Sequence, residues 1–248
     1  MANPLPILWL VTARSGSKSI PHKNIKLLGG LPLLAHRLLS AAAIAEPGDI
    51  WISTDSRDYA DIAKAHGASV PFLRPPELSG DTAKSSDVVL HAMDWAERAG
   101  KRYAAVCVLE PTSPFIYAGQ LRAAAAKLLD SPGAENIVAV RHVRPSTHEV
   151  QAMGPYLDIL AERIRHTAIT RRQDEAVEVT PSGGFYIAKW ESFRRNQGFY
   201  TDLTMPYLVP DQCALEIDEP MDWAWAEFLV EKKLVDMEKV HGKDLSIE

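Results

Sequence analysis

Cysteine is scarce in this sequence, and no pattern of residues marks a zinc or disulfide protein. Only 2 of the 248 residues are cysteines, Cys107 and Cys213, and each lies inside an apolar segment. Two cysteines cannot build a disulfide framework or a cysteine zinc site, and the 8 histidines show no ligand spacing with them or with one another. Buried free thiols are typical of a reducing compartment, so we expect a cytoplasmic protein.

Long apolar runs and an excess of positive charge are also missing. No stretch reaches the roughly 18 consecutive apolar residues of a transmembrane helix, and residues 1–11 lack the basic leader of a secretory signal. The net charge is −5, from 27 basic and 32 acidic residues, whereas nucleic-acid-binding proteins carry a net basic surface. We therefore expect neither a membrane nor a nucleic acid as a partner. The composition, 46% hydrophobic and 24% charged, is that of a globular protein, and residues 1–248 are expected to form one domain.

Apolar runs of strand length alternate with helical patterns along most of the chain. The expected strands lie over Ile7–Thr12, Ile50–Thr54, Val70–Leu73, Tyr103–Leu109, Asn136–His142, Gly183–Trp190, Tyr207–Val209 and Ala214–Ile217. The expected helices lie over Pro32–Ile44, Arg57–His66, Ser85–Ala99, Ala118–Leu129 and Glu219–Leu234. Such alternation is typical of βαβ units, so the sequence predicts an α/β fold around a mostly parallel sheet.

One segment, Val143–Pro181, interrupts this alternation. It is polar, has weak periodicity and carries five arginines, Arg144, Arg163, Arg165, Arg171 and Arg172. A loop of this length inside a compact domain is uncommon unless it has a function. We interpret the segment as an excursion that forms an interface with a partner or a lid.

The loop after the first strand, Thr12–Asn24, is the most informative part of the sequence. It contains three cations, Arg14, Lys18 and Lys23, while Ser15, Gly16 and Ser17 permit tight turns whose backbone N–H groups can bind an anion. Ligands of open α/β sheets bind at the carboxyl ends of the strands, so the loop suits a triphosphate. It has neither the Walker A pattern nor the Gly-x-Gly-x-x-Gly fingerprint. A solvated basic loop would have the same composition.

Two further segments follow predicted strands. Leu73–Thr82 holds Arg74 beside two prolines that fix the backbone, and it leads into the helix at Ser85. Glu110 stands at the end of the Tyr103–Leu109 strand, which directs it toward the same crevice as the first loop. Arg74 could equally form a surface pair with a glutamate, and Glu110 could equally be a salt-bridge partner.

Two carboxylates near the last helix are candidates for a metal site. Glu216 and Asp218 alternate along a predicted strand, so both side chains would point to one face. Magnesium prefers carboxylates together with phosphate oxygens, and the pair could hold it. Asp218 is also a suitable N-cap for the last helix, and the spacing alone does not decide between these two roles.

Five short motifs follow one another in order over about residues 7–230. They are Ala13–Lys18 with Lys23 and Asn24, Ser53–Asp55, Leu73–Leu78 with Asp81–Ala83, Pro111–Pro114, and Ile217 with Asp218. In this order they resemble the CMP-sialic acid synthetases, the acylneuraminate cytidylyltransferases. The related Kdo cytidylyltransferases are a more distant likeness.

The resemblance implies a Rossmann-like three-layer nucleotidyltransferase fold, with a small dimerisation excursion over about residues 143–181. It implies transfer of CMP from CTP to the anomeric hydroxyl of a sialic-acid-like 2-keto sugar acid, a nonulosonic acid, with release of pyrophosphate and with Mg²⁺ as cofactor. It also implies a homodimer in which each subunit completes the site of its partner.

The resemblance also implies a role for each matching residue. Arg14, Lys23 and Asp218 would be catalytic, and Ser15, Gly16, Ser17 and Lys18 would wrap the triphosphate that Arg14 and Lys23 neutralise. Asn24, Arg74 and Ser85 would hold the ribose and cytosine, and Asp218 with Glu216 would bind magnesium. Glu110 and Thr112 would contact the sugar, and Arg172 would supply a cation to the sugar carboxylate of the neighbouring subunit.

The sequence departs from the family pattern at four positions. The family usually has glutamine at Glu110, arginine at Ile116, aspartate at Glu216 and Asn-Gly at Ser182-Gly183. Because Glu110 and Ile116 are expected near the sugar, the departures predict a sugar other than N-acetylneuraminate, such as a legionaminic or a deaminated acid. A Kdo-type enzyme is disfavoured by the arginine-rich excursion. An inactive nucleotide-binding regulatory protein is the alternative from another class; the intact Arg14, Lys23 and Asp218 argue against it.

Overall fold

The structure is a computed structural model that describes residues 6–143, 152–153, 155–156, 158–166 and 177–247. Its strands are β1 (Ile7–Thr12), β2 (Leu27–Leu28), β3 (Leu31–Pro32), β4 (Ile50–Ser53), β5 (Ala105–Leu109), β6 (Asn136–His142), β7 (Val179–Lys189) and β8 (Thr204–Leu208). Its α-helices are α1 (Leu33–Ala42), α2 (Arg57–Ala65), α3 (Ser85–Arg98), α4 (Ala118–Leu129), α5 (Asp158–His166), α6 (Trp190–Asn196), α7 (Pro220–Glu231) and α8 (Met237–Val240). Short 3-10 turns are η1 (Lys23–Ile25), η2 (Pro47–Asp49), η3 (Pro76–Leu78) and η6 (Asp211–Cys213).

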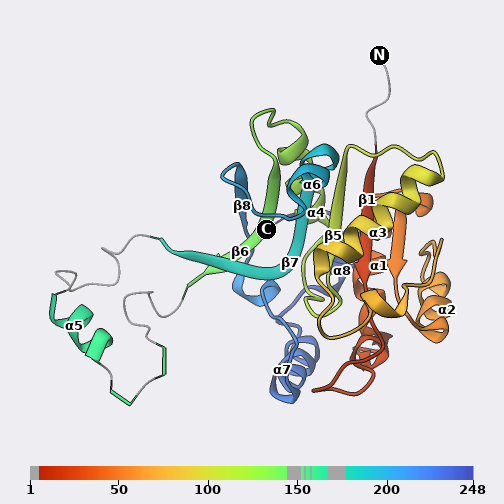
Figure 1. Cartoon of the computed structure of the whole chain (residues 1–248). Coiled ribbons are helices and arrows are strands. Elements are labelled where there is room, and N and C mark those ends of the chain that lie inside the picture. The colour runs from red at the N-terminus through yellow and green to blue at the C-terminus, as the bar shows by residue number, and fades with distance from the viewer. Residues whose placement is uncertain (1–5, 144–151, 154, 157, 167–176, 248) are drawn as a thin grey trace.

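Six strands form the central sheet, in the order β4-β1-β5-β7-β6-β8 (Figure 1). β1 pairs in parallel with β4 and β5, and β6 pairs in parallel with β8, whereas β7 is antiparallel to both of its neighbours. The strands at the centre are buried on both faces, which is why they appear in the sequence as nearly continuous apolar runs. The predicted α/β fold with a mostly parallel sheet is confirmed.

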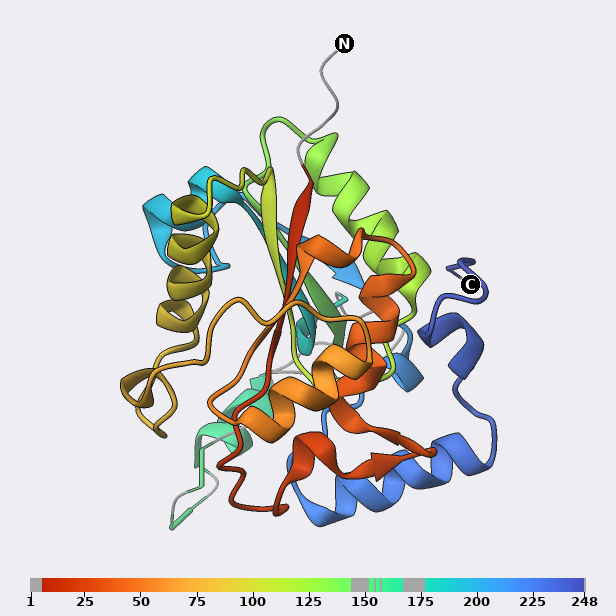
Figure 2. The same ribbon diagram turned by 90° about the vertical axis from the view of Figure 1, so that its right-hand side faces the viewer.

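The helices cover both faces of the sheet and make three layers. Along β1, Trp9 and Val11 belong to a core shared with α1, α4 and α7, whereas Leu8 and Leu10 face a second core built from α3 and α6. This division follows from the alternation of side chains along a strand. Figure 2 shows α3 and α6 on one side of the sheet and α1 and α4 on the other.

Two predicted strands are wrong. Val70–Leu73 contains no strand; only Ser69 makes an isolated bridge, to Trp51, because the prolines that follow cannot donate to a ladder. Ala214–Ile217 has no regular secondary structure. It is held by a hydrogen bond, 2.8 Å long, from the Ile217 backbone N–H to the Thr112 carbonyl. Glu216 and Asp218 therefore do not share a strand face.

Other element boundaries differ modestly from the predictions. β7 begins at Val179, inside the supposed excursion, and β8 begins at Thr204. The helix predicted over Glu219–Leu234 corresponds to α7, which ends earlier, at Glu231. A separate short helix, α8, follows. The hairpin of β2 and β3 and the helix α6 were not predicted, because two-residue strands and a seven-residue helix leave too little periodicity.

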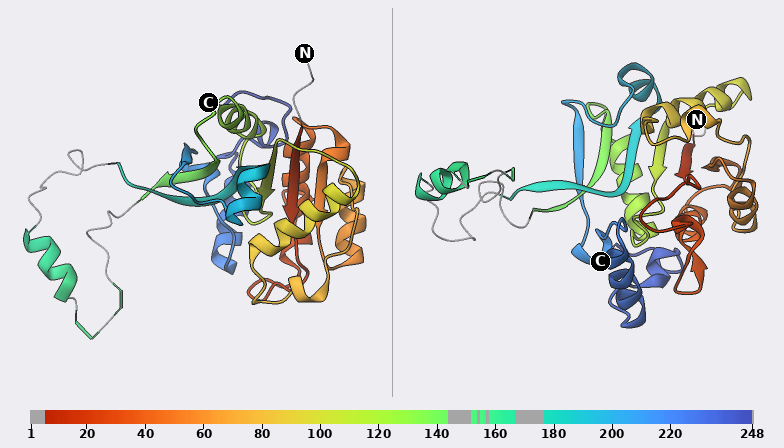
Figure 3. Two further views of the ribbon diagram at one scale, coloured as in Figure 1. Left: turned by 45° about the horizontal axis from the view of Figure 1, so that its top comes forward. Right: turned by 60° about the horizontal axis from the view of Figure 1, so that its bottom comes forward.

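An arm leaves the sheet between β6 and β7. The two strands stay paired as far as His142 and Val179, and Figures 1 and 3 show their far ends and α5 projecting from the body. The predicted excursion therefore coincides with this arm. Arg144, Arg171 and Arg172 lie outside the described residues. No helix in the described part of the chain is long and apolar enough to cross a membrane.

Candidate active site

A cleft of about 600 Å³ lies where β1 and β5 end. Its lining contains most of the predicted site residues: Arg14, Ser17, Lys18, Lys23, Asn24, Arg74, Ser85, Glu110, Thr112, Glu216 and Asp218. Ser15 and Gly16 are not part of the lining, and Arg172 lies outside the described residues. Segments more than 200 residues apart in sequence thus meet at the carboxyl edge of the sheet, where α/β proteins bind ligands.

Asp55 anchors the first loop. The backbone N–H and the hydroxyl of Ser15 each donate to the Asp55 carboxylate, both at 2.8 Å. Asp55 follows β4, the strand next to β1, so the anchor comes from the adjacent strand end. Asp55 was not predicted as a site residue, although it lies just after a buried strand, as Glu110 does.

The two exposed cations of the first loop share one carboxylate. Arg14 Nη1 lies 2.8 Å from Asp81 Oδ1, and Lys18 Nζ lies 2.5 Å from Asp81 Oδ2. Asn24 fixes the backbone beside them, because its side-chain amide donates to the Arg14 carbonyl at 3.0 Å. Asp81 therefore links the first loop to the segment that precedes α3.

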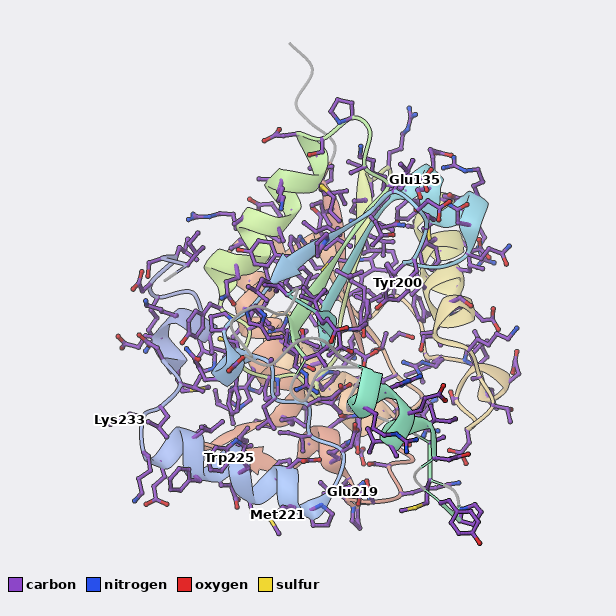
Figure 4. The ribbon with its side chains drawn as sticks, turned by 90° about the vertical axis from the view of Figure 1, so that its left-hand side faces the viewer. Glu135, Tyr200, Glu219, Met221, Trp225 and Lys233 are labelled. Carbon is purple, nitrogen blue, oxygen red and sulfur yellow. The ribbon has the colours of Figure 1, made fainter. Side chains whose placement is uncertain are left out.

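Lys23 is a buried cation of the cleft, like Arg74. Its Nζ donates to the Ile217 carbonyl at 2.6 Å and lies 3.2 Å from Asp218 Oδ1. The Asp218 side chain does not cap α7. The N-cap is Glu219, whose backbone N–H donates to the Asp222 carboxylate at 2.8 Å in a capping box. The N-cap interpretation of Asp218 is therefore wrong, and its carboxylate faces Lys23; Figure 4 shows Glu219 at the start of α7, ahead of Met221 and Trp225.

Arg74 is held on the opposite wall. Its Nε donates to Ser53 Oγ at 3.0 Å and its Nη2 donates to the Ser53 carbonyl at 2.6 Å. Burial lowers the pKa of Arg74 to about 10, so the guanidinium remains charged at neutral pH. Ser85 begins α3, and the positive end of that helix dipole adds to the positive charge of this wall.

Three carboxylates gather at the other end of the cleft. Burial, followed by the charges of Glu216 and Asp218, raises the pKa of Glu110 to about 7 against the opposing effect of Lys23. Burial, followed by the Asp218 charge, also raises the pKa of Glu216. Three carboxylates thus stand against the charges of Arg141 and Lys23 at this end of the cleft, which favours a bound cation.

The described residues hold no group of three Asp, Glu, His or Cys side chains arranged around a metal ion. A magnesium ion does not require one, because it usually binds one or two carboxylates together with phosphate oxygens and water. Asp218 and Glu216 fit that donor set.

Ile116 does not lie at the sugar position that the sequence comparison suggested. Its side chain is fully buried in the core, and an ideal Cβ on Gly184 would be 2.5 Å from its Cδ1. This expectation is wrong, because the residue turns inward after Pro114. Of the positions that depart from the family pattern, Glu110 and Glu216 line the cleft.

Comparison with known proteins identifies the family. A model of the cytidylyltransferase family matches residues 8–200. The chain is 31% identical over 229 residues to the CMP-N,N'-diacetyllegionaminic acid synthase of Legionella pneumophila, covering 91% of this chain and 96% of that protein. It is 27% identical to the N-acylneuraminate cytidylyltransferase of Escherichia coli O18:K1:H7 and 32% identical to N-acylneuraminate cytidylyltransferase A of Danio rerio. These matches cover 92% and 88% of this chain but span only 52% and 49% of the two relatives.

Solved structures with the same fold include a CMP:2-keto-3-deoxy-manno-octonic acid synthetase complexed with CTP, which has a TM-score of 0.65 at 14% identity and covers 92% of this chain and 99% of that one. A cytidylyltransferase from Leptospira borgpetersenii has a TM-score of 0.60, also at 14% identity, and covers 97% of this chain and 92% of that one. At such identity the likeness concerns the fold alone. The family match and the Legionella relative carry the assignment, and the chain therefore belongs to the cytidylyltransferase family, among the CMP-sialic acid synthetases.

Proposed function

We propose that the protein transfers CMP from CTP to the anomeric hydroxyl of a nonulosonic acid and releases pyrophosphate. The observation that carries this proposal is the meeting of Lys23 with Asp218 in the cleft that Arg14 and Lys18 also line. The cleft thus offers cations at one end and carboxylates at the other. Such a transfer depends on positioning and charge neutralisation more than on covalent catalysis.

Each wall of the cleft has a part in this reaction. Arg14, Lys18 and Lys23 neutralise the triphosphate, while Arg74 and Ser85 hold the ribose and the cytosine. The oxygen of the sugar hydroxyl forms the new bond to the α-phosphorus and loses its proton to solvent. The bond from the α-phosphorus to the bridging oxygen breaks, and that oxygen leaves with the pyrophosphate. Lys23 is buried and held by the Ile217 carbonyl, so its charge stands at a fixed point beside Asp218.

We propose Mg²⁺ as the cofactor, held by Asp218 with Glu216 and by phosphate oxygens of the substrate. The excess of carboxylate charge around Lys23 supports this assignment. When bound, the ion screens the phosphates and lowers the pKa of a coordinated hydroxyl.

The sugar is proposed to differ from N-acetylneuraminate. Glu110 lines the cleft where the family usually has glutamine, and a carboxylate accepts hydrogen bonds without donating them. The relative from Legionella pneumophila is named for N,N'-diacetyllegionaminic acid, which supports a legionaminate-like substrate.

We further propose a cytoplasmic homodimer in which the arm of one subunit brings Arg172 to the site of the other. The projecting arm supports the dimer, and the two buried free thiols, Cys107 and Cys213, suit a reducing compartment.

Pyrophosphate release tests the function. The protein, with magnesium, is incubated with CTP, UTP, ATP or GTP and with N-acetylneuraminate, a deaminated nonulosonic acid, N,N'-diacetyllegionaminate or Kdo. We expect release only with CTP and a nonulosonic acid. Release with Kdo alone would favour the Kdo-type enzyme, and no release with any pair would favour an inactive nucleotide-binding protein.

A further inference from the structure

Asp81 stands between the nucleotide-binding segments without belonging to the assigned machinery. It lies in the turn between η3 and α3, on the wall opposite the first loop, and it lines the cleft. Its two carboxylate oxygens are used separately: Oδ1 receives Arg14 and Oδ2 receives Lys18. One carboxylate thus holds both of the exposed cations of the first loop.

The geometry makes Asp81 the counter-ion of these cations. Among the described residues, no other carboxylate forms an ion pair with Arg14 or Lys18. Hydrogen bonds from Lys18 and then from Arg14 hold the pKa of Asp81 below its usual value, so it stays ionised at neutral pH. The carboxylate is therefore available to both cations at neutral pH.

Phosphate oxygens require the same two cations. A pyrophosphate or triphosphate group bound by Arg14 and Lys18 competes with the Asp81 carboxylate for these cations, because two anions at one site repel each other. The pairs of Asp81 are solvent-exposed, with side-chain exposures of 49% for Asp81 and 79% for Lys18, and pairs of this kind are weak enough to exchange. The first loop itself stays anchored during the exchange by Ser15 and Asp55.

We propose that Asp81 is a positioning residue that holds Arg14 and Lys18 at the phosphate site and competes with the pyrophosphate product for them. This inference rests on the proposed function for the identity of the product. When pyrophosphate leaves, the Asp81 carboxylate pairs again with both cations. The departure of pyrophosphate therefore leaves no unpaired positive charge on Arg14 or Lys18. Asp81 thereby weakens the binding of pyrophosphate and assists its release.

Calorimetric titration with inorganic pyrophosphate tests this competition without CTP or sugar. Asp81→Asn removes the charge at constant shape, Asp81→Ser is a second variant in case the first misfolds, and Asp81→Glu keeps the charge. Asp61→Asn is the matched control. Asp61 Oδ1 lies 3.0 Å from Lys64 Nζ on the exposed surface of α2, and neither residue lines the cleft. Circular dichroism verifies the fold of each variant.

We expect Asp81→Asn and Asp81→Ser to bind pyrophosphate about three- to tenfold more tightly than the wild type, given the modest strength of exposed pairs. Asp81→Glu is expected to restore most of the weak binding, and Asp61→Asn to change nothing. In turnover assays Asp81→Asn lowers both the KM for CTP and the kcat, whereas a merely structural role would raise KM. Unchanged or weaker pyrophosphate binding in Asp81→Asn, or no binding by any variant, would overturn the inference. Tighter binding in a protein that transfers no CMP would uphold it and overturn the proposed function instead.

Discussion

At the scale of single residues, the proposed function gives phosphate binding and the choice of sugar to different side chains of the cleft. Arg14, Lys18 and Lys23 can neutralise any triphosphate, whereas Glu110 is a departure from the family that lines the cleft. Burial and the neighbouring carboxylates raise its pKa to about 7, so its neutral, hydrogen-bond-donating form is present near neutral pH and is lost at higher pH.

Glu110→Gln should therefore change the choice of sugar. Glutamine donates a hydrogen bond at every pH, and one matched polar contact in a buried site is worth about ten- to a hundredfold in specificity. At pH 8, where Glu110 is ionised, we expect the ratio of kcat/KM for N-acetylneuraminate to that for the native sugar to rise at least about tenfold. At pH 6, where Glu110 is mostly protonated, the gap between variant and wild type should shrink. A ratio that is the same in both proteins at both pH values would identify Glu110 as a structural residue.

At the scale of elements, the site depends on loops and strands fitted closely together. Gly183 in β7 shows this most clearly: its φ is +67°, and an ideal Cβ there would be 2.7 Å from Glu216 Oε1 and 2.8 Å from Ser113 Oγ. The backbone of β7 thus passes directly against the carboxylate end of the cleft. A side chain at this position would both strain the backbone and push Glu216 aside.

Gly183→Ala should lower the free energy of unfolding by about 1–3 kcal/mol, from the left-handed φ and the overlap together. Gly133→Ala is the control, because Gly133 lies in open space without a left-handed φ. Urea denaturation measures both variants, and we expect the control to be neutral or slightly stabilised. Equal stabilities of the two variants would mean that β7 can move away from Glu216 at little cost.

The C-terminal helix α8 is held to α1 by a histidine pair. His36 Nε2 faces the Leu28 carbonyl at 3.0 Å and must donate to it, so His36 Nδ1 accepts from His241 Nε2 at 3.0 Å. Burial, followed by the charge of His241, lowers the pKa of His36 from 6.5 to about 4. The unfolded chain therefore binds a proton more readily than the folded one between these values, and stability falls as the pH drops from about 6.5 toward 4.

His36→Gln should reduce this acid sensitivity. The lowered pKa of His36 contributes up to about 3 kcal/mol to the difference in unfolding free energy between neutral and strongly acidic pH. Urea denaturation at pH 7.5 and pH 4.5 measures the difference, which we expect to shrink in the variant. His142→Gln, at the end of β6, serves as the control, because its charge is not among those that act on His36. An identical pH dependence in His36→Gln and the wild type would contradict the assignment.

Some of these elements were predictable from the sequence and others were not, and the physical reasons differ. Buried parallel strands such as Ile7–Thr12 are continuous apolar runs, which are easy to recognise in a sequence. The helix Ala118–Leu129 and the strand Asn136–His142 were also predicted with the limits that the structure shows. Val70–Leu73 failed because Pro71 removes a backbone donor from the middle of this short apolar run. Ala214–Ile217 failed because its conformation is set by a contact with Thr112, about a hundred residues earlier.

The candidate site was predictable in part for a similar reason. Residues that follow a buried strand, such as Arg14 and Glu110, are directed to the ligand-binding edge by the sheet itself. Asp55 and Asp81 escaped notice as site residues because their partners, Ser15 and Arg14, are 40 and 67 residues away. The N-cap of α7 could not be decided from spacing, since Asp218 is a preferred cap residue whereas the observed cap, Glu219, depends on its capping box with Asp222.

At the scale of the whole molecule, the arm is the feature that a single subunit does not explain. It extends β6 and β7 beyond the sheet and carries α5 away from the body (Figure 3). In the proposed homodimer, the arm of each subunit covers the other, and the symmetric pair exchanges two arms. Light scattering should give about twice the mass of 27.4 kDa.

Subunit mixing tests whether the arm completes the partner's site. Asp218→Asn inactivates the site in its own subunit, and Arg172→Ala is expected to inactivate the site of its partner. A mixed dimer then has one fully intact site, so mixing equal amounts of the two inactive variants should restore about a quarter of the wild-type sites. Exchange is allowed to reach equilibrium before the assay. No recovery on mixing, or full activity of a monomer at nanomolar concentration, would contradict the shared site.

The most direct measurement of the central claim is formation of the CMP-sugar itself by the wild type and by Asp218→Asn. Each protein is incubated with CTP, magnesium and N,N'-diacetyllegionaminate or N-acetylneuraminate, and the product is identified by mass spectrometry; Asp211→Asn, which lies outside this cleft, is the control. We predict a CMP-sugar with the wild type and the control, and at least about a thousandfold less with Asp218→Asn, which loses charge stabilisation at the reacting centre. A wild type that forms no CMP-sugar, or an Asp218→Asn variant with near-native turnover, would contradict the proposed reaction or its assignment to this cleft.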